Sequence, residues 1–276
     1  MLGKKSLAVH LGSIMPPVPT VGGRLDGGAA TLLGSLGAAT LLAWACVRAL
    51  RHPRTYLPLT FAQVWEIGIA SLPLVLLVAM ISGAVTSEQT GYQYSSTLPP
   101  WVAGSVITAS VVTELGPLST GFVLIGRVGA RIGAELAAMS VSEQIQALRT
   151  LGRDPVVYLV VPRVLAALIA VPALVALADA SGMLAGWGVA LVRIPITTSE
   201  FATGARAYFQ PFQLYFSLLK GAVFGGSIAF IACAAGLRAK GGAAGVGRAT
   251  TVSVVVATVT MMILDLLLAR LLRVFG

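Results

Sequence analysis

Three ionisable residues lie inside stretches that are otherwise apolar. Glu114 interrupts residues 101–125, Lys220 is the single charge in residues 208–237, and Asp265 lies near the end of residues 249–272. Charged groups are costly inside a bilayer, and they usually face a protein interior or a watery cavity. We predict that Glu114 pairs with Lys220 and that this pair lines or gates a transport path. The alternative is an ion pair that only fixes helix packing, which is the role we predict for Asp265.

A second polar group lies at the end of the first long apolar stretch. It contains Thr86, Glu88, Gln89, Tyr92 and Tyr94, and an uncharged loop follows it. Two interpretations are open. The tyrosines belong to the aromatic belt that marks a membrane interface, or this group forms the wall of a lipid pocket at the centre of a dimer.

The chain contains no residues spaced as in a known catalytic, metal or nucleotide-binding motif. The two cysteines and two histidines stand apart, without the spacing of a metal site. Gly126, Gly129 and Gly133 resemble a nucleotide loop only superficially, because no Gly-Lys-Ser/Thr follows them anywhere in the chain. Small residues at this spacing more often let membrane helices approach closely. We therefore predict no catalytic residue, no metal and no bound cofactor.

A short amphipathic helix is predicted at residues 140–152. Ser140 and Glu143 have the spacing of a capping box, Gly152 stands where a helix C-cap belongs, and Pro155 prevents continuation. Such a helix in a loop is either a docking surface or a plain surface helix. The pattern favours neither.

The composition indicates an integral membrane protein. Apolar residues make up 57% of the 276 residues, charged residues make up 11%, and the mean hydropathy is +0.89. An ordinary soluble domain has roughly 25% charged residues. A soluble enzyme, a disordered chain and a nucleic-acid-binding protein are all poor interpretations of this composition.

We expect an all-α integral membrane protein with five transmembrane helices in a single domain, residues 26–276. A tail of residues 1–25 is expected to be poorly ordered. An interfacial helix is expected at about residues 27–50; the alternative is that this helix spans. The spans are expected at about residues 64–90, 100–126, 156–190, 208–237 and 249–272.

The basic residues predict the orientation. Most of the 19 Lys and Arg residues fall on one side if the N-terminus is cytoplasmic and the C-terminus is periplasmic. The helix at residues 140–152 then lies in the cytoplasm between spans two and three. A spanning N-terminal helix would move Lys4, Lys5 and Arg24 outside, which weakens this bias.

Several motifs resemble the MlaE/YrbE family of ABC-transporter permeases. The resemblance covers the chain from about residue 25 to its end, in the order and spacing of that family. One departure is Thr113, where family members carry Arg before Glu-Leu-Gly-Pro, and another is Glu88, at a usually apolar position. The matching stretches are Gly83 to Gln89, Glu114 to Pro117, Gly126 to Met139, Glu143 to Leu148, Asp154 with Pro155, Tyr158 to Leu165, Gly247 to Thr251, and Leu264 with Asp265.

The resemblance implies a homodimer in the bacterial inner membrane that moves phospholipid or a related lipid between the inner and outer membranes. It implies separate ATPase subunits that bind ATP and Mg, and an MCE-domain lipid-binding partner. Residues 140–152 would be the helix that couples to the ATPase. The candidate coupling residues are Glu135, Ser140, Glu143, Ile145, Leu148, Arg149 and Asp154.

Two other functions are compatible with parts of the sequence. An ion-coupled secondary carrier would use Glu88, Glu114 and Asp265 as ion sites, although the chain lacks an internal repeat. A non-transporting membrane anchor for a lipid-binding protein is the second alternative.

Overall fold

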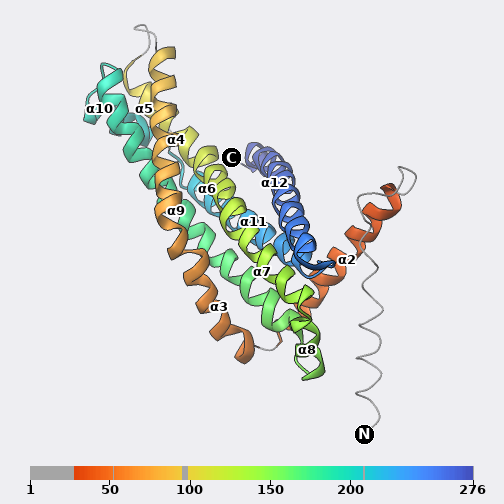
Figure 1. Cartoon of the computed structure of the whole chain (residues 1–276). Helices are drawn as coiled ribbons and strands as arrows, with labels where there is room; N and C mark the ends of the chain where they lie inside the picture. Colours follow the sequence, from red (N-terminus) through yellow and green to blue (C-terminus); the bar gives the residue numbers. More distant parts are fainter. Residues whose placement is uncertain (1–27, 52, 95–98, 208, 276) are drawn as a thin grey trace.

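The computed structural model describes residues 28–51, 53–94, 99–207 and 209–275, with side chains described from residue 37 to residue 271. Within these ranges the chain forms helices and no strands (Figure 1). The predicted tail of residues 1–25 lies outside the described residues. The helices are α2 (Gly28–Ala49), α3 (Pro53–Ile67), η2 (Ile69–Ser71), α4 (Leu72–Gln93), α5 (Trp101–Ser110), η3 (Val111–Leu115), α6 (Gly116–Leu124), η4 (Ile125–Gly129), α7 (Ala130–Val141), α8 (Gln144–Thr150), η5 (Val156–Val160), α9 (Val161–Arg193), α10 (Thr198–Ala207), α11 (Pro211–Gly236) and α12 (Gly242–Phe275).

Five helical segments of the described chain are long and apolar enough to cross a membrane, which confirms the predicted all-α membrane fold. The bounds of α2 agree with the predicted N-terminal helix, and the part of α2 whose side chains the structure describes, Gly37–Ala49, is an apolar helix. Whether α2 lies in the interface stays a prediction. The five segments are Pro53–Gln93, Trp101–Val141, Val156–Arg193, Pro211–Gly236 and Gly242–Leu271.

The second segment is longer than predicted. Residues 126–141 were expected to begin a loop, but they continue the helix through η4 and α7. The physical reason is a buried face, because Leu136 is fully buried and Gly129 and Gly133 let α7 approach Ile228 and Ser253. The small residues therefore serve close helix packing, as predicted, although Gly126 faces open space.

The core lies where α9 and α11 pack together with α4, α6, α7 and α12 around them. One close crossing is between α4 and α9. A Cβ added at Gly83 would lie 2.0 Å from the Gly182 carbonyl oxygen, so glycine at this position is required by space. Such small-residue contacts are typical of helices packed in membranes.

Two helices, α3 and α10, were not predicted from the sequence. The basic stretch around Pro53 begins α3, where proline suits the first helical position. In α10, the Glu200 carboxylate accepts hydrogen bonds from the amide and hydroxyl of Thr197, while the Glu200 amide donates to the Thr197 hydroxyl. This reciprocal pair is a capping box, and the Thr-x-x-Glu spacing could have revealed it.

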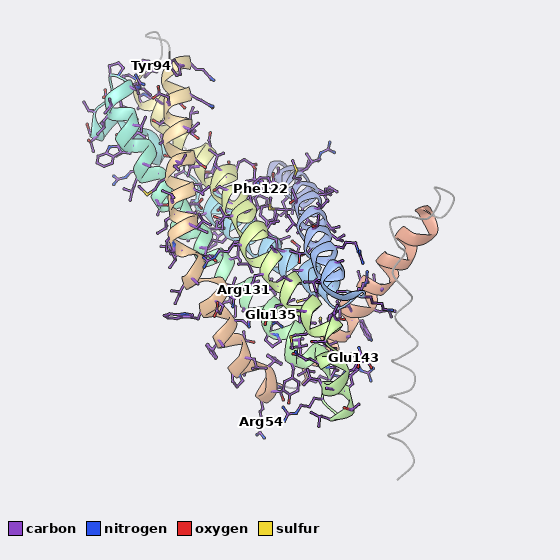
Figure 2. All side chains as sticks on the ribbon, viewed as in Figure 1. Arg54, Tyr94, Phe122, Arg131, Glu135 and Glu143 are labelled. Carbon is purple, nitrogen blue, oxygen red and sulfur yellow. The ribbon has the colours of Figure 1, made fainter. Side chains whose placement is uncertain are left out.

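The molecule is elongated, with α8 at one end and α10 at the other (Figure 1). Tyr94 lies at the α10 end, whereas Arg54 and Glu143 lie at the α8 end (Figure 2). The predicted outer polar group and the predicted docking helix are therefore at opposite ends, as two faces of a membrane require.

Candidate functional site

The three charges within the apolar segments meet in one cluster. The Lys220 Nζ donates to Glu114 Oε2 at 2.7 Å, and it lies 2.8 Å from Asp265 Oδ1. The predicted Glu114–Lys220 pair is therefore confirmed as a contact. Asp265, predicted as a structural charge, binds the same ammonium, so α11 and α12 are joined to η3 by one cation.

The local backbone explains why the lysine is held here. Pro117 has no N–H, so it cannot donate to the Thr113 carbonyl four residues earlier. The helix widens into the π-helical turn η3, and the Lys220 Nζ donates to the Thr113 carbonyl at 3.1 Å. Single π turns in helices occur often at functional sites. The sequence signal is the Glu-Leu-Gly-Pro stretch itself.

Charge in this cluster, defined as Glu114, Lys220 and Asp265, is unevenly distributed. One ammonium faces two carboxylates, and the Lys220 side chain is fully buried. The Glu114 side chain, in contrast, is 39% exposed. A carboxylate that is both paired and open to the surface of the chain can meet a ligand, whereas the lysine cannot.

Asp179 is a buried acid that the sequence predictions passed over. It lies on α9 at 2% exposure, and its Oδ2 accepts a 2.8 Å hydrogen bond from the Ser217 hydroxyl. A Cβ added at Gly116 would lie 1.7 Å from Asp179 Oδ1, so the acid fits against α6 only because residue 116 is glycine. Ser217 precedes Lys220 by one helical turn, which places this second polar contact next to the cluster. An aspartate within a predicted span was the available signal.

The outer polar group is spread over the end of α4. Glu88 pairs with Arg193 of α9 at 2.7 Å, Tyr92 is 80% exposed, and Tyr94 packs against a small apolar cluster that includes Phe201. The hydroxyl of Thr86 donates to a backbone carbonyl of its own helix, and Gln89 is exposed. A lipid pocket that these residues would share between two chains stays a prediction.

A shallow surface depression, too small to enclose a water molecule, occurs deeper along α4. Ala79, Ser82 and Gly83 line it from α4, and Leu115 and Gly116 line it from the helix that carries Glu114. This depression is therefore nearer to the ion cluster than to the outer tyrosines.

The predicted capping box at residues 140–152 is wrong. Ser140 lies in the last turn of α7, where its hydroxyl donates to the carbonyls of Leu237 and Ala239. Glu143 precedes α8 in a left-handed conformation at φ 61° and makes no side-chain cap. The helix is consequently the shorter α8. The reason is that the apolar face of α7 continues through the expected start.

The predicted end of the helix is confirmed. Gly152 has φ 74°, its amide donates to the Arg149 carbonyl, and the Arg153 amide donates to the Leu148 carbonyl. These two bonds form a Schellman motif. The Asp154 carboxylate then accepts from the Val156 amide and caps the next helix.

The candidate coupling residues divide into two groups. Ile145 is buried at 6% exposure and Glu135 pairs with the buried Arg163 at 2.8 Å, so both hold the chain's own helices together. Glu143 and Arg149 are exposed on or beside α8, and Leu148 is half-buried. Leu151, which was not among the candidates, is 74% exposed and adds an apolar contact point.

Comparison with known proteins identifies the chain's relatives. The sequence profile described as "Permease MlaE" matches residues 60–271. A probable ABC transporter permease protein of Rickettsia felis is 38% identical over 237 residues, which cover 86% of this chain and 92% of that protein. A probable ABC transporter permease protein of Synechocystis is 34% identical, covering 77% and 81%. The chloroplastic protein TRIGALACTOSYLDIACYLGLYCEROL 1 of Arabidopsis thaliana is 33% identical, covering 76% and 60%.

Proposed function

Because the chain belongs to the MlaE permease family, we propose that it is the membrane-spanning subunit of an ABC transporter for phospholipid or a related lipid. ATP would be hydrolysed with Mg on separate ATPase subunits, and two copies of this chain would form the membrane path. An MCE-domain lipid-binding protein would exchange lipid at the α10 end. The end that carries α8 would lie on the cytoplasmic side of a bacterial inner membrane.

One observation carries this proposal: a single helical segment joins the docking helix to the ion cluster. Residues Trp101–Val141 run without interruption from α5 to α7, and α8 follows after two residues. Glu114 lies within this segment. A displacement of α8 would therefore be transmitted along a continuous helix to the contacts of Lys220.

The anchoring of α8 supports the same mechanism. Ile145 is buried against the chain, while Arg149 and Leu151 remain exposed. A partner that binds the exposed side of α8 would move α7 together with α8, because the buried side of α8 packs against the rest of the chain. ATP can drive such a shift only if the ATPase binds it differently in two states.

The lipid path is best sought beside Glu114. Its carboxylate is partly exposed, and the next residue, Leu115, lines the depression between α4, η3 and α6. Polar and ionisable residues in membrane segments mark substrate pathways. We expect lipid to pass along this face, with the ion cluster holding the helices in one arrangement until α8 moves.

Coupling is tested by Leu151→Glu in full-length chain purified and reconstituted with its ATPase subunit. The matched control is Val192→Glu, which changes another exposed apolar residue, 83% exposed at the far end of α9. We expect Leu151→Glu to reduce ATPase co-purification and ATP-dependent lipid transfer by about tenfold or more. The control should retain the ATPase. Wild-type co-purification and lipid transfer with Leu151→Glu would refute docking through α8.

A further inference from the structure

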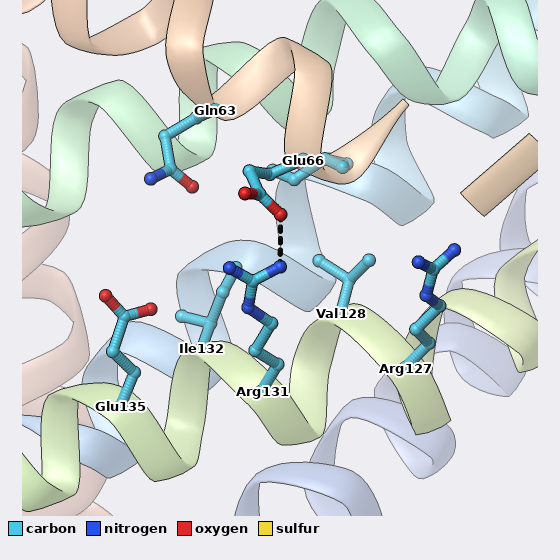
Figure 3. Close-up of a pocket in the computed structure, with 8 residues that line it drawn as sticks. Gln63, Glu66, Arg127, Val128, Arg131, Ile132 and Glu135 are labelled. Carbon is cyan, nitrogen blue, oxygen red and sulfur yellow. Dashed lines mark hydrogen bonds and ion pairs between the residues drawn. The ribbon is translucent and has the colours of Figure 1, made fainter. Parts of the chain in front are cut away.

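The acidic residues of the membrane-crossing segments have basic partners, with one exception. Glu66 of α3, for example, is hydrogen-bonded to Arg131 of α7 across a narrow recess (Figure 3). Asp179 of α9 is the exception, because it forms no ion pair with any residue that the structure describes. None of the functions discussed above uses Asp179. The other pairs are Glu88 with Arg193, Glu135 with Arg163, and Glu114 and Asp265 with Lys220.

The Asp179 carboxyl is buried with a single hydrogen bond. Its Oδ2 accepts from the Ser217 hydroxyl at 2.8 Å, and its Oδ1 has no hydrogen-bond partner in the part of the chain that the structure describes. An ionised carboxylate can accept about four hydrogen bonds. A buried charge without a counter-ion binds a proton instead of staying ionised. These contacts therefore fit the neutral acid, in which one carboxyl oxygen carries a hydrogen.

The packing around the carboxyl leaves no space for a counter-ion. A Cβ added at Gly116 would lie 1.7 Å from Asp179 Oδ1, so the backbone at the start of α6 lies directly against this oxygen. The depression that Gly116 and Ala178 line is too small for a water molecule. A proton on the carboxyl itself, in contrast, needs no additional space.

The charges on the neighbouring α11 and η3 also favour the neutral acid. Lys220 follows Ser217 by one turn of α11, but its ammonium is already shared by Glu114 and Asp265. An ionised Asp179 would add a third carboxylate beside one ammonium. Neighbouring like charges disfavour ionisation, so protonation of Asp179 avoids this repulsion.

The other helices packed on α9 carry their charges away from the level of Asp179. No charged residue occurs in α5 or α6. Glu88 of α4 pairs with Arg193, the last residue of α9. The end of α3 is followed by Gly68, which packs against Ala170, about two and a half helical turns before Asp179. The remaining charged residues on these helices are Arg54 and Glu66 of α3 and Glu200 and Arg206 of α10.

We propose that Asp179 is a proton-binding site that is occupied in the arrangement described by the structure and emptied when α6 moves away from α9. Release transfers the proton from the carboxyl oxygen to a water molecule that enters between the helices, which leaves a carboxylate and a hydronium ion. Because the packed arrangement holds the proton more tightly than the separated one, acidic pH favours the packed arrangement. The release step rests on the proposed function, in which the segment that carries α6 moves with α8.

The first test records infrared absorption of the full-length chain at neutral pH, without nucleotide, in a detergent that has no carbonyl group. The carbonyl stretch of a protonated carboxyl is separate from the bands of a carboxylate. We expect a protonated-carboxyl band that shifts when aspartate is isotopically labelled at its side-chain carboxyl carbon. Asp179→Asn should remove this band, whereas Asp154→Asn, at an exposed aspartate, should keep it.

The labelled wild-type chain decides the proposal even if the variant does not fold. The absence of a protonated-carboxyl band that responds to aspartate labelling would overturn the proposal. A band that persists in Asp179→Asn would assign the proton to another aspartate and would also overturn it. Asp179→Asn keeps an uncharged polar side chain of the same shape, so its SDS-unfolding midpoint should stay close to that of wild type.

The second test records the same band in the complex with the ATPase subunit, with and without ATP, while hydrolysis is blocked. We expect the Asp179 band to be lost when ATP binds. A band unchanged by ATP, in a complex that transfers lipid when hydrolysis is allowed, would overturn the release step. A complex in which ATP supports no lipid transfer would refute the proposed function, while the first test still decides whether Asp179 holds a proton.

Discussion

Replacement of Lys220 by methionine tests the ion cluster most directly. Methionine fills a similar volume without the charge, so the packing around this fully buried side chain is largely kept. Glu114 and Asp265 lose their shared cation and face each other across the site as two carboxylates. The Thr113 carbonyl also loses its donor.

The expected cost follows from the exposure of each partner. Removing one partner of a buried ion pair costs about 3–5 kcal/mol. Asp265 is 17% exposed and keeps most of this cost, whereas Glu114 is 39% exposed and water relieves part of its share. We therefore expect the lower end, about 3 kcal/mol, which corresponds to roughly a hundredfold change in the unfolding equilibrium.

The assay is SDS-induced unfolding of the purified chain in mixed micelles, followed by helical circular dichroism. Lys220→Met should unfold at lower SDS than wild type. The triple variant Lys220→Met, Glu114→Gln, Asp265→Asn removes all three charges and should recover most of the loss. An unchanged midpoint for Lys220→Met would refute the inference that this lysine holds the helices together. If the triple variant is stable and also transports lipid normally, the cluster has no part in transport.

Three further predictions concern other contacts. Gly83→Ala should destabilise the α4–α9 crossing by about 1–3 kcal/mol, because its Cβ would overlap the Gly182 carbonyl; a wild-type SDS midpoint would contradict this. The Thr197 hydrogen bonds lower the pKa of Glu200, so the cap of α10 is complete above the ordinary glutamate pKa of about 4.3 and is lost as pH falls through the lowered value. Amide exchange of α10, corrected for the intrinsic pH effect, should therefore lose protection at low pH, and Glu200→Gln should abolish that dependence. Gly152→Ala should fray α8 at a cost of about 1–2 kcal/mol, because a side chain at φ 74° is strained, and hydrogen exchange confined to α8 would report it.

The apolar segments and the ion cluster were predictable from the sequence, because charge inside a long apolar run has few acceptable positions. Lys220 had to find a carboxylate, and Glu114 was available at a comparable depth. What the sequence did not show is how many carboxylates would share the lysine. The position of Asp265 near the end of its segment gave no indication that α12 crosses α11 at this level.

The start of α8 illustrates a different limit. The Ser140–Glu143 spacing predicts a cap only if the preceding chain is not already helical. Burial of Leu136 extends α7 past that point, and this tertiary contact outweighs the local signal. Gly152, in contrast, was correctly read, since a positive φ is a local requirement that distant packing does not change.

The π turns that precede α8, η3 and η4, also set the angular phase of α8. Each accommodates one residue more than a regular α-helix, and one residue corresponds to a rotation of about 100° and a rise of 1.5 Å. Deleting one residue from either turn would therefore rotate the exposed side of α8 about the helix axis by more than a quarter of a turn. The number of residues in η3, which ends 29 positions before α8 begins, therefore helps to determine the direction in which the chain presents α8 to a partner.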